Sequence, residues 1–93
     1  MFSVSELLGQ KYSLVSSFGF AKGERNMKKL AKRIGANIVR ERTRLGLTQE
    51  KLAYENDISK GYISDIESGK KLPSIKMLAK IADALEVDLK ELL

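Results

Sequence analysis

The sequence predicts an all-α fold, a domain of five helices preceded by an N-terminal arm. Two observations predict it: apolar residues recur at helical spacing through residues 27–93, and residues that favour helix N-caps stand before successive stretches. The 93 residues, 43% of them hydrophobic, are enough for one small core. Residues 1–26 differ in character, so we expect an arm in residues 1–26 and one helical domain in residues 27–93.

The first predicted helix carries one apolar stripe and ends at a glycine. Residues four and seven positions apart lie on the same side of a helix. The stripe consists of Leu30, Ile34, Ile38 and Leu45. Gly46 follows it and is expected to end the helix, because glycine readily adopts the backbone conformation of a C-terminal cap.

The next two predicted helices are short and are joined by a tight turn. Thr48 and Ser59 are the expected N-caps. Asp57 occupies the turn, where a left-handed backbone is expected and aspartate is better tolerated than most residues. The residues expected to face the core are Leu52, Ala53, Ile63 and Ile66. The segment therefore predicts a helix-turn-helix, whose second helix fits the major groove of DNA.

Two further helices are expected to close the core. Ser74, which follows the only proline, Pro73, is the expected cap of the fourth. Residues 88–91 match the capping-box pattern and predict a short fifth helix. The inward-facing residues are Met77, Leu78, Ile81, Ala82, Leu85, Leu89 and Leu92.

Residues 1–26 are rich in serine and glycine and contain an aromatic-rich stretch, residues 12–20, that favours an extended strand or arm over a helix. Two interpretations stay open: disorder, or packing of Tyr12, Phe18 and Phe20 against a partner or the helical domain. A third hypothesis is that Met27 is the true start, since codons for residues 22–24 can form a purine-rich stretch resembling a bacterial ribosome-binding site.

Charge favours a polyanionic partner, and composition argues against several kinds of site. The net charge is +5, and residues 27–45 alone hold seven cations and one anion. The chain has no cysteine and no histidine, which removes disulfides, the usual zinc ligands and the commonest general base. We therefore expect no enzyme, metal or cofactor. The N-terminus lacks the pattern of a signal peptide or membrane span, so a cytoplasmic location is expected.

Residues 34–93 resemble the bacterial Xre family, the lambda-repressor-like and Cro-like helix-turn-helix domains of phage repressors, restriction-modification controllers and antitoxins. The motif elements follow one another in the family's order. They include Ile34-Gly35, Arg42, residues 47–50, Leu52-Ala53, Ile58-Ser59, Ile63-Ser64, Ile66-Glu67, Gly69-Lys70, Pro73-Ser74 and Ile81-Ala82.

The resemblance implies that the third helix faces base edges through Lys60, Gly61, Ser64 and Asp65. Lys60 would donate to guanine, Ser64 would pair with several bases and Asp65 would accept from cytosine N4. Alternatively, Asp65 orients Lys60 or a water. Gly61 would allow close approach of the helix backbone to the groove; the alternative is a helix-destabilising glycine, costing about 1 kcal/mol relative to alanine.

The expected phosphate contacts are Thr48, Gln49, Ser59, Tyr62, Lys70 and Lys71. For Tyr62, partial burial against the second helix is an equal alternative. By resemblance, Arg42 and Glu67 form a structural ion pair between the first and third helices. The remaining basic cluster of the first helix either flanks the DNA or is a solvated face; it comprises Lys28, Lys29, Lys32 and Arg33.

The expected function is sequence-specific DNA binding by a transcriptional regulator, acting as a repressor. It would bind a palindromic operator in double-stranded DNA as a homodimer, with residues 59–67 as the recognition helix and half-site centres about 34–36 Å apart. The alternative is an antitoxin or protein-interaction module whose arm binds a partner protein. Either protein would be encoded by a bacterium or a phage.

Overall fold

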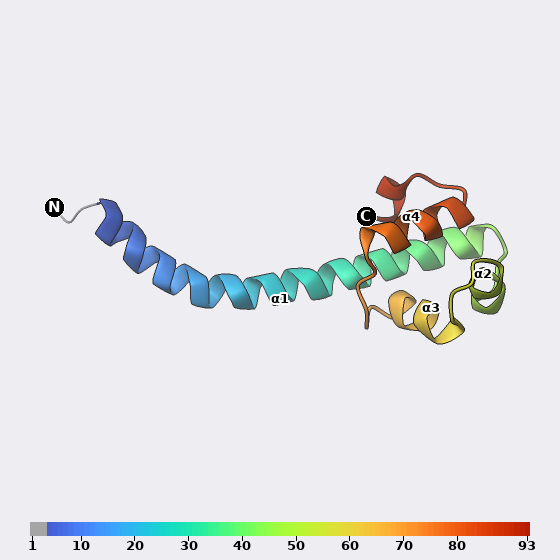
Figure 1. Cartoon of the computed structure of the whole chain (residues 1–93), viewed down its shortest axis with the longest axis horizontal. Coiled ribbons are helices and arrows are strands. Elements are labelled where there is room, and N and C mark those ends of the chain that lie inside the picture. The colour runs from blue at the N-terminus through green and yellow to red at the C-terminus, as the bar shows by residue number, and fades with distance from the viewer. Residues whose placement is uncertain (1–3) are drawn as a thin grey trace.

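The computed structural model describes the backbone of residues 4–93 and the side chains of residues 23–93, and every regular element in this part is helical (Figure 1). The elements are α1 (Val4–Arg44), α2 (Gln49–Glu55), α3 (Lys60–Glu67), α4 (Ile75–Ala84) and the 3-10 helix η1 (Leu89–Leu92). The all-α prediction is confirmed. The predicted fifth α-helix is instead a 3-10 turn, and its N-cap residue Asp88 forms no side-chain capping hydrogen bond. Among the described residues, no helix combines the length and apolar character needed to span a bilayer.

Helix α1 begins at Val4, so the extended conformation predicted for residues 12–20 is wrong. Once a helix is nucleated, each further residue adds a hydrogen bond without a new nucleation cost, which offsets weak helix formers. The sequence also holds a helical signal that strand propensity obscured: Val4, Leu8, Val15 and Phe18 are separated by four, seven and three residues. The expected packing of the arm's aromatic side chains lies outside the described part.

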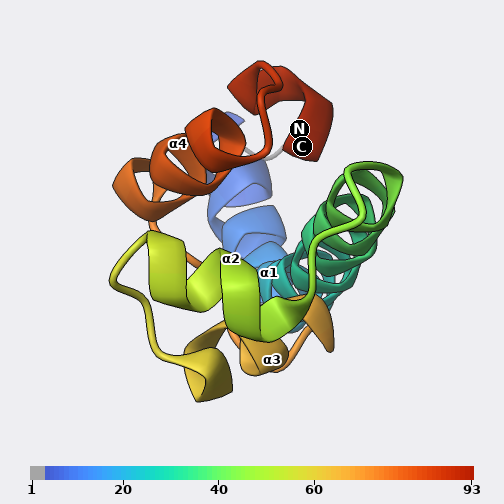
Figure 2. The ribbon, with the colours of Figure 1, turned by 90° about the vertical axis from the view of Figure 1, so that its right-hand side faces the viewer.

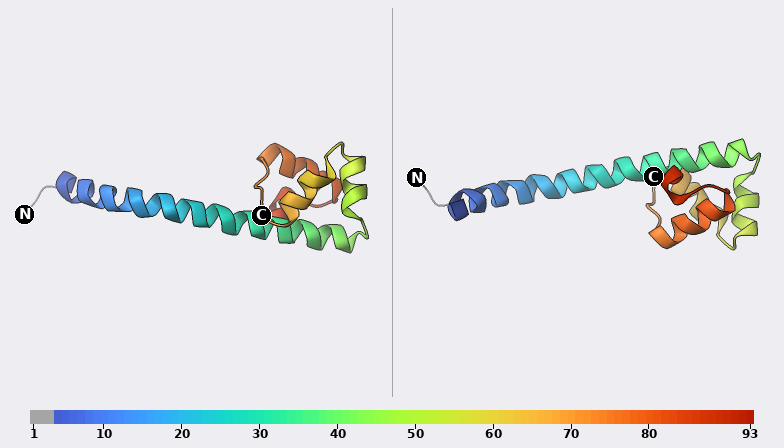
Figure 3. Two further views of the ribbon diagram at one scale, coloured as in Figure 1. Left: turned by 90° about the horizontal axis from the view of Figure 1, so that it is seen from below. Right: turned by 90° about the horizontal axis from the view of Figure 1, so that it is seen from above.

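The other helices gather around the C-terminal half of α1, which continues away from them as a single rod (Figures 1 and 3). The principal extents are 63 × 23 × 19 Å. Figure 2 shows the molecule from the end opposite the N-terminus of α1. In this view α2 lies in front, with α3 and α4 on different sides of it. The core therefore lies between the last turns of α1 and the three short helices.

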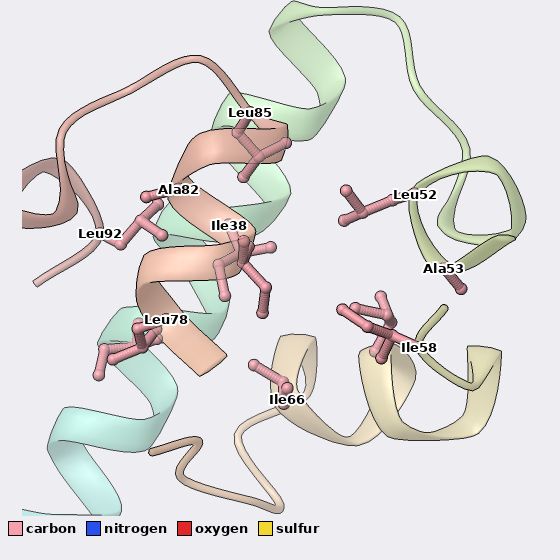
Figure 4. Close-up of a cluster of buried hydrophobic side chains, with 12 residues drawn as sticks. Ile38, Leu52, Ala53, Ile58, Ile66, Leu78, Ala82, Leu85 and Leu92 are labelled. Carbon is pink, nitrogen blue, oxygen red and sulfur yellow. The ribbon is translucent and has the colours of Figure 1, made fainter. Parts of the chain in front are cut away.

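Twelve buried residues from all five elements form the core (Figure 4). Those from α1 are Ile34 and Ile38, and the others are Leu52, Ala53, Ile58, Ile63, Ile66, Leu78, Ile81, Ala82, Leu85 and Leu92. The predicted Leu30 is exposed, and Ala31 is buried in its place. Leu45, Met77 and Leu89 are partly buried against the core. Most of the predicted core is thus confirmed, except that the buried stripe of α1 begins at Ala31 and not at Leu30.

Two contacts hold other elements against α1. A Cβ added at Gly35 would lie 2.6 Å from the carbonyl oxygen of Glu67 and would also clash with that of Ile66, so α1 and α3 approach too closely for any larger residue. At the other side, the amide nitrogen Nδ2 of Asn37 donates to the carbonyl oxygen of Leu92 at 3.0 Å. This bond satisfies a carbonyl at the end of η1.

Glu41, near the end of α1, is a buried carboxylate between two arginines. Its Oε1 accepts from Arg44 Nε at 2.9 Å and its Oε2 from Arg40 Nε at 3.0 Å. These hydrogen bonds, that of Arg44 foremost, lower the pKa of Glu41 below its ordinary value. Arg40 also donates to the carbonyl oxygen of Glu91 at 3.4 Å. The cluster therefore links α1 with η1.

Candidate nucleic-acid interface

The turn between α2 and α3 has the predicted caps and backbone. The hydroxyl of Thr48 accepts from the amide of Lys51 at 3.0 Å, and that of Ser59 accepts from the amide of Tyr62 at 3.1 Å. Asp57 has a left-handed backbone with φ of 54°. The amide of the next residue, Ile58, donates to the carbonyl of Ala53 at 2.9 Å. This is the 6→1 hydrogen bond of a Schellman motif. The turn thus ends α2 and starts α3 with few unpaired backbone groups.

Helix α3 buries one side and exposes the other. Ile63 and Ile66 are completely buried in the core. The four candidate base-contact residues lie on the opposite side, as two neighbouring pairs: Lys60 and Ser64 are four residues apart, and so are Gly61 and Asp65. Lys60 and Gly61 are exposed, and Ser64 and Asp65 are partly exposed. The structure therefore gathers these four residues on one outward surface.

A bidentate ion pair fixes α3 to α1. Arg42 Nε lies 2.7 Å from Glu67 Oε2, and Arg42 Nη2 lies 3.0 Å from Glu67 Oε1. The third donor, Nη1, is bonded to the carbonyl of Leu47 at 2.6 Å. The Glu67 side chain is only 4% exposed, so the geometry is held away from solvent. The orientation of α3 is therefore set by directional bonds as well as by apolar packing.

Gln49 joins this pair, a contact that the sequence did not indicate. Its Nε2 donates to Glu67 Oε1 at 2.8 Å, so the carboxylate receives bonds from both α1 and α2. The amide group of Gln49 keeps a second N–H and its carbonyl oxygen. The phosphate contact expected of Gln49 stays a prediction. No short-range pattern relates positions 49 and 67, because the contact depends on how α2 packs against α3.

Two lysines of this surface, Lys60 and Lys71, are paired with carboxylates. Lys60 Nζ lies 3.4 Å from Glu50 Oε1, and Lys71 Nζ lies 3.6 Å from Asp65 Oδ2. In the free protein Asp65 thus pairs with Lys71 and Lys60 pairs with Glu50. The alternative role of Asp65, orienting Lys60 or a water at the DNA, stays a prediction. Exposed pairs of this kind are worth about 0–1 kcal/mol, so both lysines can exchange their partners for phosphate or base oxygens at little cost.

The loop between α3 and α4 packs on α1 and presents two exposed lysines, Lys70 and Lys71. Their amides donate to the carbonyl of Asp65 at 2.9 and 3.2 Å. Gly69 has a φ of 80°, and a Cβ there would lie 2.8 Å from Cγ of Lys32. Lys71 also lies over the ring of Tyr62, 5.4 Å from its centroid. Tyr62 itself is partly buried and packs against the core.

Residues 38–92 match the family described as Helix-turn-helix. The chain belongs to the helix-turn-helix family. This match confirms the predicted resemblance to Xre and Cro-like domains. The family is not enzymatic, which agrees with the prediction that the chain is not an enzyme.

Several helix-turn-helix proteins are similar to this chain. It is 49% identical over 47 residues to control protein C.BamHI of Bacillus amyloliquefaciens, covering 50% of this chain and 58% of that protein. It is 41% identical over 58 residues to the ImmF control region 10 kDa protein of Bacillus phage phi105, covering 62% and 64%. These matches span less than two thirds of each relative.

The restriction-modification controller protein C.AhdI of Aeromonas hydrophila has a similar solved structure. It superposes with a TM-score of 0.65 and 30% sequence identity, over 68% of this chain and 96% of C.AhdI. Nearly all of C.AhdI is therefore matched, whereas about a third of this helix-turn-helix chain has no counterpart in it.

Gly61 has no packing reason to be glycine. A Cβ added there would meet nothing within 4 Å. In contrast to Gly35 and Gly69, the residue is required neither by close contacts nor by a left-handed backbone. The free protein therefore shows no requirement for glycine at position 61.

Proposed function

We propose that this helix-turn-helix protein is a sequence-specific DNA-binding transcriptional regulator that inserts α3 and its cap, residues 59–67, into the major groove. One observation carries the proposal: α3 is locked to α1 through Arg42 and Glu67 while its outer face stays exposed. Direct readout needs such a helix, because base specificity depends on side chains held at fixed positions in the groove. The names of the relatives, which include control proteins, support a regulatory role.

Four residues on the outer face of α3 are the proposed base contacts. Lys60 donates to guanine O6 and N7 after leaving Glu50, and Ser64 pairs with a neighbouring base. Asp65 accepts from cytosine N4, with Lys71 offsetting its charge beside the phosphates. Gly61 lets the backbone of α3 approach the groove without a side chain in between. The open space at its Cβ position is the observation that supports this role.

The proposed phosphate contacts border α3 on both sides. Thr48, Gln49 and Ser59 stand where α2 and α3 begin, and helix N-termini favour anions through their unpaired amides and dipoles. Tyr62, Lys70 and Lys71 stand at the other border, in α3 and the loop after it. Together these contacts would fix the register of α3 without reading sequence.

One α3 helix contacts too few bases for an operator, so we propose that two chains bind a palindrome as a homodimer. The half-site centres are then about 34–36 Å apart, one turn of DNA. The bound dimer represses by blocking RNA polymerase. The proposed setting is the bacterial cytoplasm, in agreement with relatives from bacteria and a bacterial phage.

Selection from random duplexes tests this proposal. The full chain is incubated with a random duplex pool, the retained duplexes are sequenced, and affinity is then measured by fluorescence anisotropy across salt concentrations. The proposal predicts an enriched inverted repeat and an affinity that falls steeply with salt. Salt-dependent binding without an enriched sequence would contradict sequence-specific regulation, and absence of binding at low salt would contradict DNA binding altogether.

A further inference from the structure

The basic side of α1 that faces α3 continues beyond the helix-turn-helix. We infer that Arg25, Lys28 and Lys32 form a second phosphate-binding site, which contacts the DNA backbone outside the half-site read by α3. This inference rests on the proposed function, since it extends the same DNA-binding surface. It assigns a role to the long α1 helix, whose N-terminal half reaches past the other helices (Figures 1 and 3).

The positions of these residues on α1 follow from the helix repeat. Seven residues make about two turns, so Lys28, Gly35 and Arg42 lie along one side of α1. That side faces α3, because a Cβ at Gly35 would lie 2.6 Å from the carbonyl oxygen of Glu67 and Arg42 is paired with the Glu67 carboxylate. Lys28 therefore points to the side on which α3 lies, two turns beyond the contact.

Lys32 connects this side with the loop after α3. A Cβ at Gly69 would lie 2.8 Å from Lys32 Cγ and 3.1 Å from Lys32 Cα, so Lys32 lies directly beside the loop that carries Lys70 and Lys71. Arg25 lies seven residues before Lys32 and so follows it along the helix. All three cations are exposed. Together with the loop lysines they make a continuous basic edge running from α3 along α1.

Charge distribution explains why a further basic site is needed. Residues 48–71, which hold α2, α3 and the following loop, have four lysines against five carboxylates. Residues 23–33 of α1 have five cations against one carboxylate. Because phosphate contacts supply much of the affinity for DNA, the helix-turn-helix segment alone is poorly charged for it. The projecting part of α1 supplies the missing positive charge.

The side of α1 that faces η1 offers a matched control. Arg33 lies seven residues before Arg40, which contacts the carbonyl of Glu91, and so belongs to the side of η1. Lys90 lies in η1 itself, and both Arg33 and Lys90 are exposed. Replacing Arg33 and Lys90 removes as much charge as replacing Lys28 and Lys32, but on the side of η1.

The test compares K28Q/K32Q with R33Q/K90Q on the operator selected by the unaltered chain. Glutamine keeps the Cγ atom of Lys32 that lies beside Gly69, and equal melting temperatures would verify the fold of both variants. Affinity is measured by anisotropy between about 50 and 200 mM salt. Because two chains bind each operator, K28Q/K32Q removes four phosphate contacts from the complex. The slope of log affinity against log salt should therefore be shallower by about four for K28Q/K32Q, so that its loss of affinity over this range is about a hundredfold smaller, and unchanged for R33Q/K90Q.

Shortening the operator from its outer ends provides a second readout. The unaltered chain and R33Q/K90Q should lose affinity when the flanking phosphates are removed, whereas K28Q/K32Q should not. Equal salt slopes in the two variants would overturn the inference, because charge alone would then explain the effect. If the unaltered chain selects no operator, the proposed function fails as well; if it does select one and the variants behave alike, only the second site fails.

Discussion

Two glycines, Gly35 at the contact of α1 with α3 and Gly61 on the outer face of α3, show how a single residue type serves different purposes. Gly35 is required by packing, because backbone carbonyls of α3 occupy the space of a Cβ. Gly61 faces open space in the free protein. A test at these two positions therefore separates a requirement of the fold from a requirement of DNA binding.

We predict that Gly61→Ala raises the stability of the fold and weakens operator binding. Alanine is favoured over glycine by about 1 kcal/mol in a helix interior, and this value is an upper bound for Gly61, which lies in the first turn of α3. No neighbour opposes a Cβ at position 61. Urea unfolding and anisotropy measure the two effects. Gly35→Ala is the control, since it should destabilise the fold. Operator binding by Gly61→Ala at full affinity would contradict close approach of the α3 backbone to the groove.

The Arg42–Glu67 pair gives a second prediction at this scale. Arg42→Ala should lower the free energy of unfolding by about 3–5 kcal/mol, because the Glu67 carboxylate stays buried without its bidentate partner. Lys51→Ala is the matched control: its pair with Glu55, at 3.8 Å, is exposed and should contribute less than about 1 kcal/mol. Equal losses in the two variants, measured by urea unfolding, would show that the buried pair does not hold α3.

At the level of elements, the cluster of Glu41 with Arg40 and Arg44, which links α1 with η1, makes the stability of the fold depend on pH. Hydrogen bonds from Arg44 and Arg40 lower the pKa of Glu41 below its ordinary value of 4.5. The folded protein therefore holds this proton less tightly than the unfolded chain does. The contribution of Glu41 to stability is fully present above pH 4.5 and is lost as the pH falls through the lowered folded pKa.

We expect Glu41→Gln to be less stable than the unaltered chain at pH 7 and the difference to narrow on acidification below pH 4.5. Urea unfolding of both chains over this pH range gives the difference in their free energies of unfolding. The other carboxylates titrate in both chains, so their contributions cancel in this difference. A difference that stays constant with pH would contradict the lowered pKa.

Local features of the elements could be predicted from the sequence. Of the tertiary contacts at the site, the Arg42–Glu67 pair was implied by the family resemblance, and the others could not be predicted. The caps Thr48, Ser59 and Ser74 and the left-handed Asp57 depend on near neighbours in the chain, and all four have the predicted geometry. The N-terminal part of α1 carries two opposing signals, because residues 12–20 have strand propensity while the apolar residues have helical spacing, and the structure follows the spacing. The bonds of Gln49 to Glu67 and of Lys60 to Glu50 depend on packing between helices, for which a single sequence holds no local signal.

At the scale of the whole molecule, the account predicts two chains on each operator. A palindrome presents two equivalent half-sites, and a C2 dimer places one α3 helix in each. Sedimentation of the complex should give two chains per duplex, and a duplex with a single half-site should bind far more weakly. One chain per full operator with undiminished binding to a half-site would contradict the dimer.

Base reading by the outer face of α3 can be tested by repeating the duplex selection with Lys60→Ala. We expect the inverted repeat to persist while the preference at one guanine in each half-site relaxes, and the original operator to be bound more weakly by about 1–3 kcal/mol per half-site. Lys51→Ala, on α2, should select the original operator. An unchanged preference at every base pair with Lys60→Ala would contradict base reading by this face.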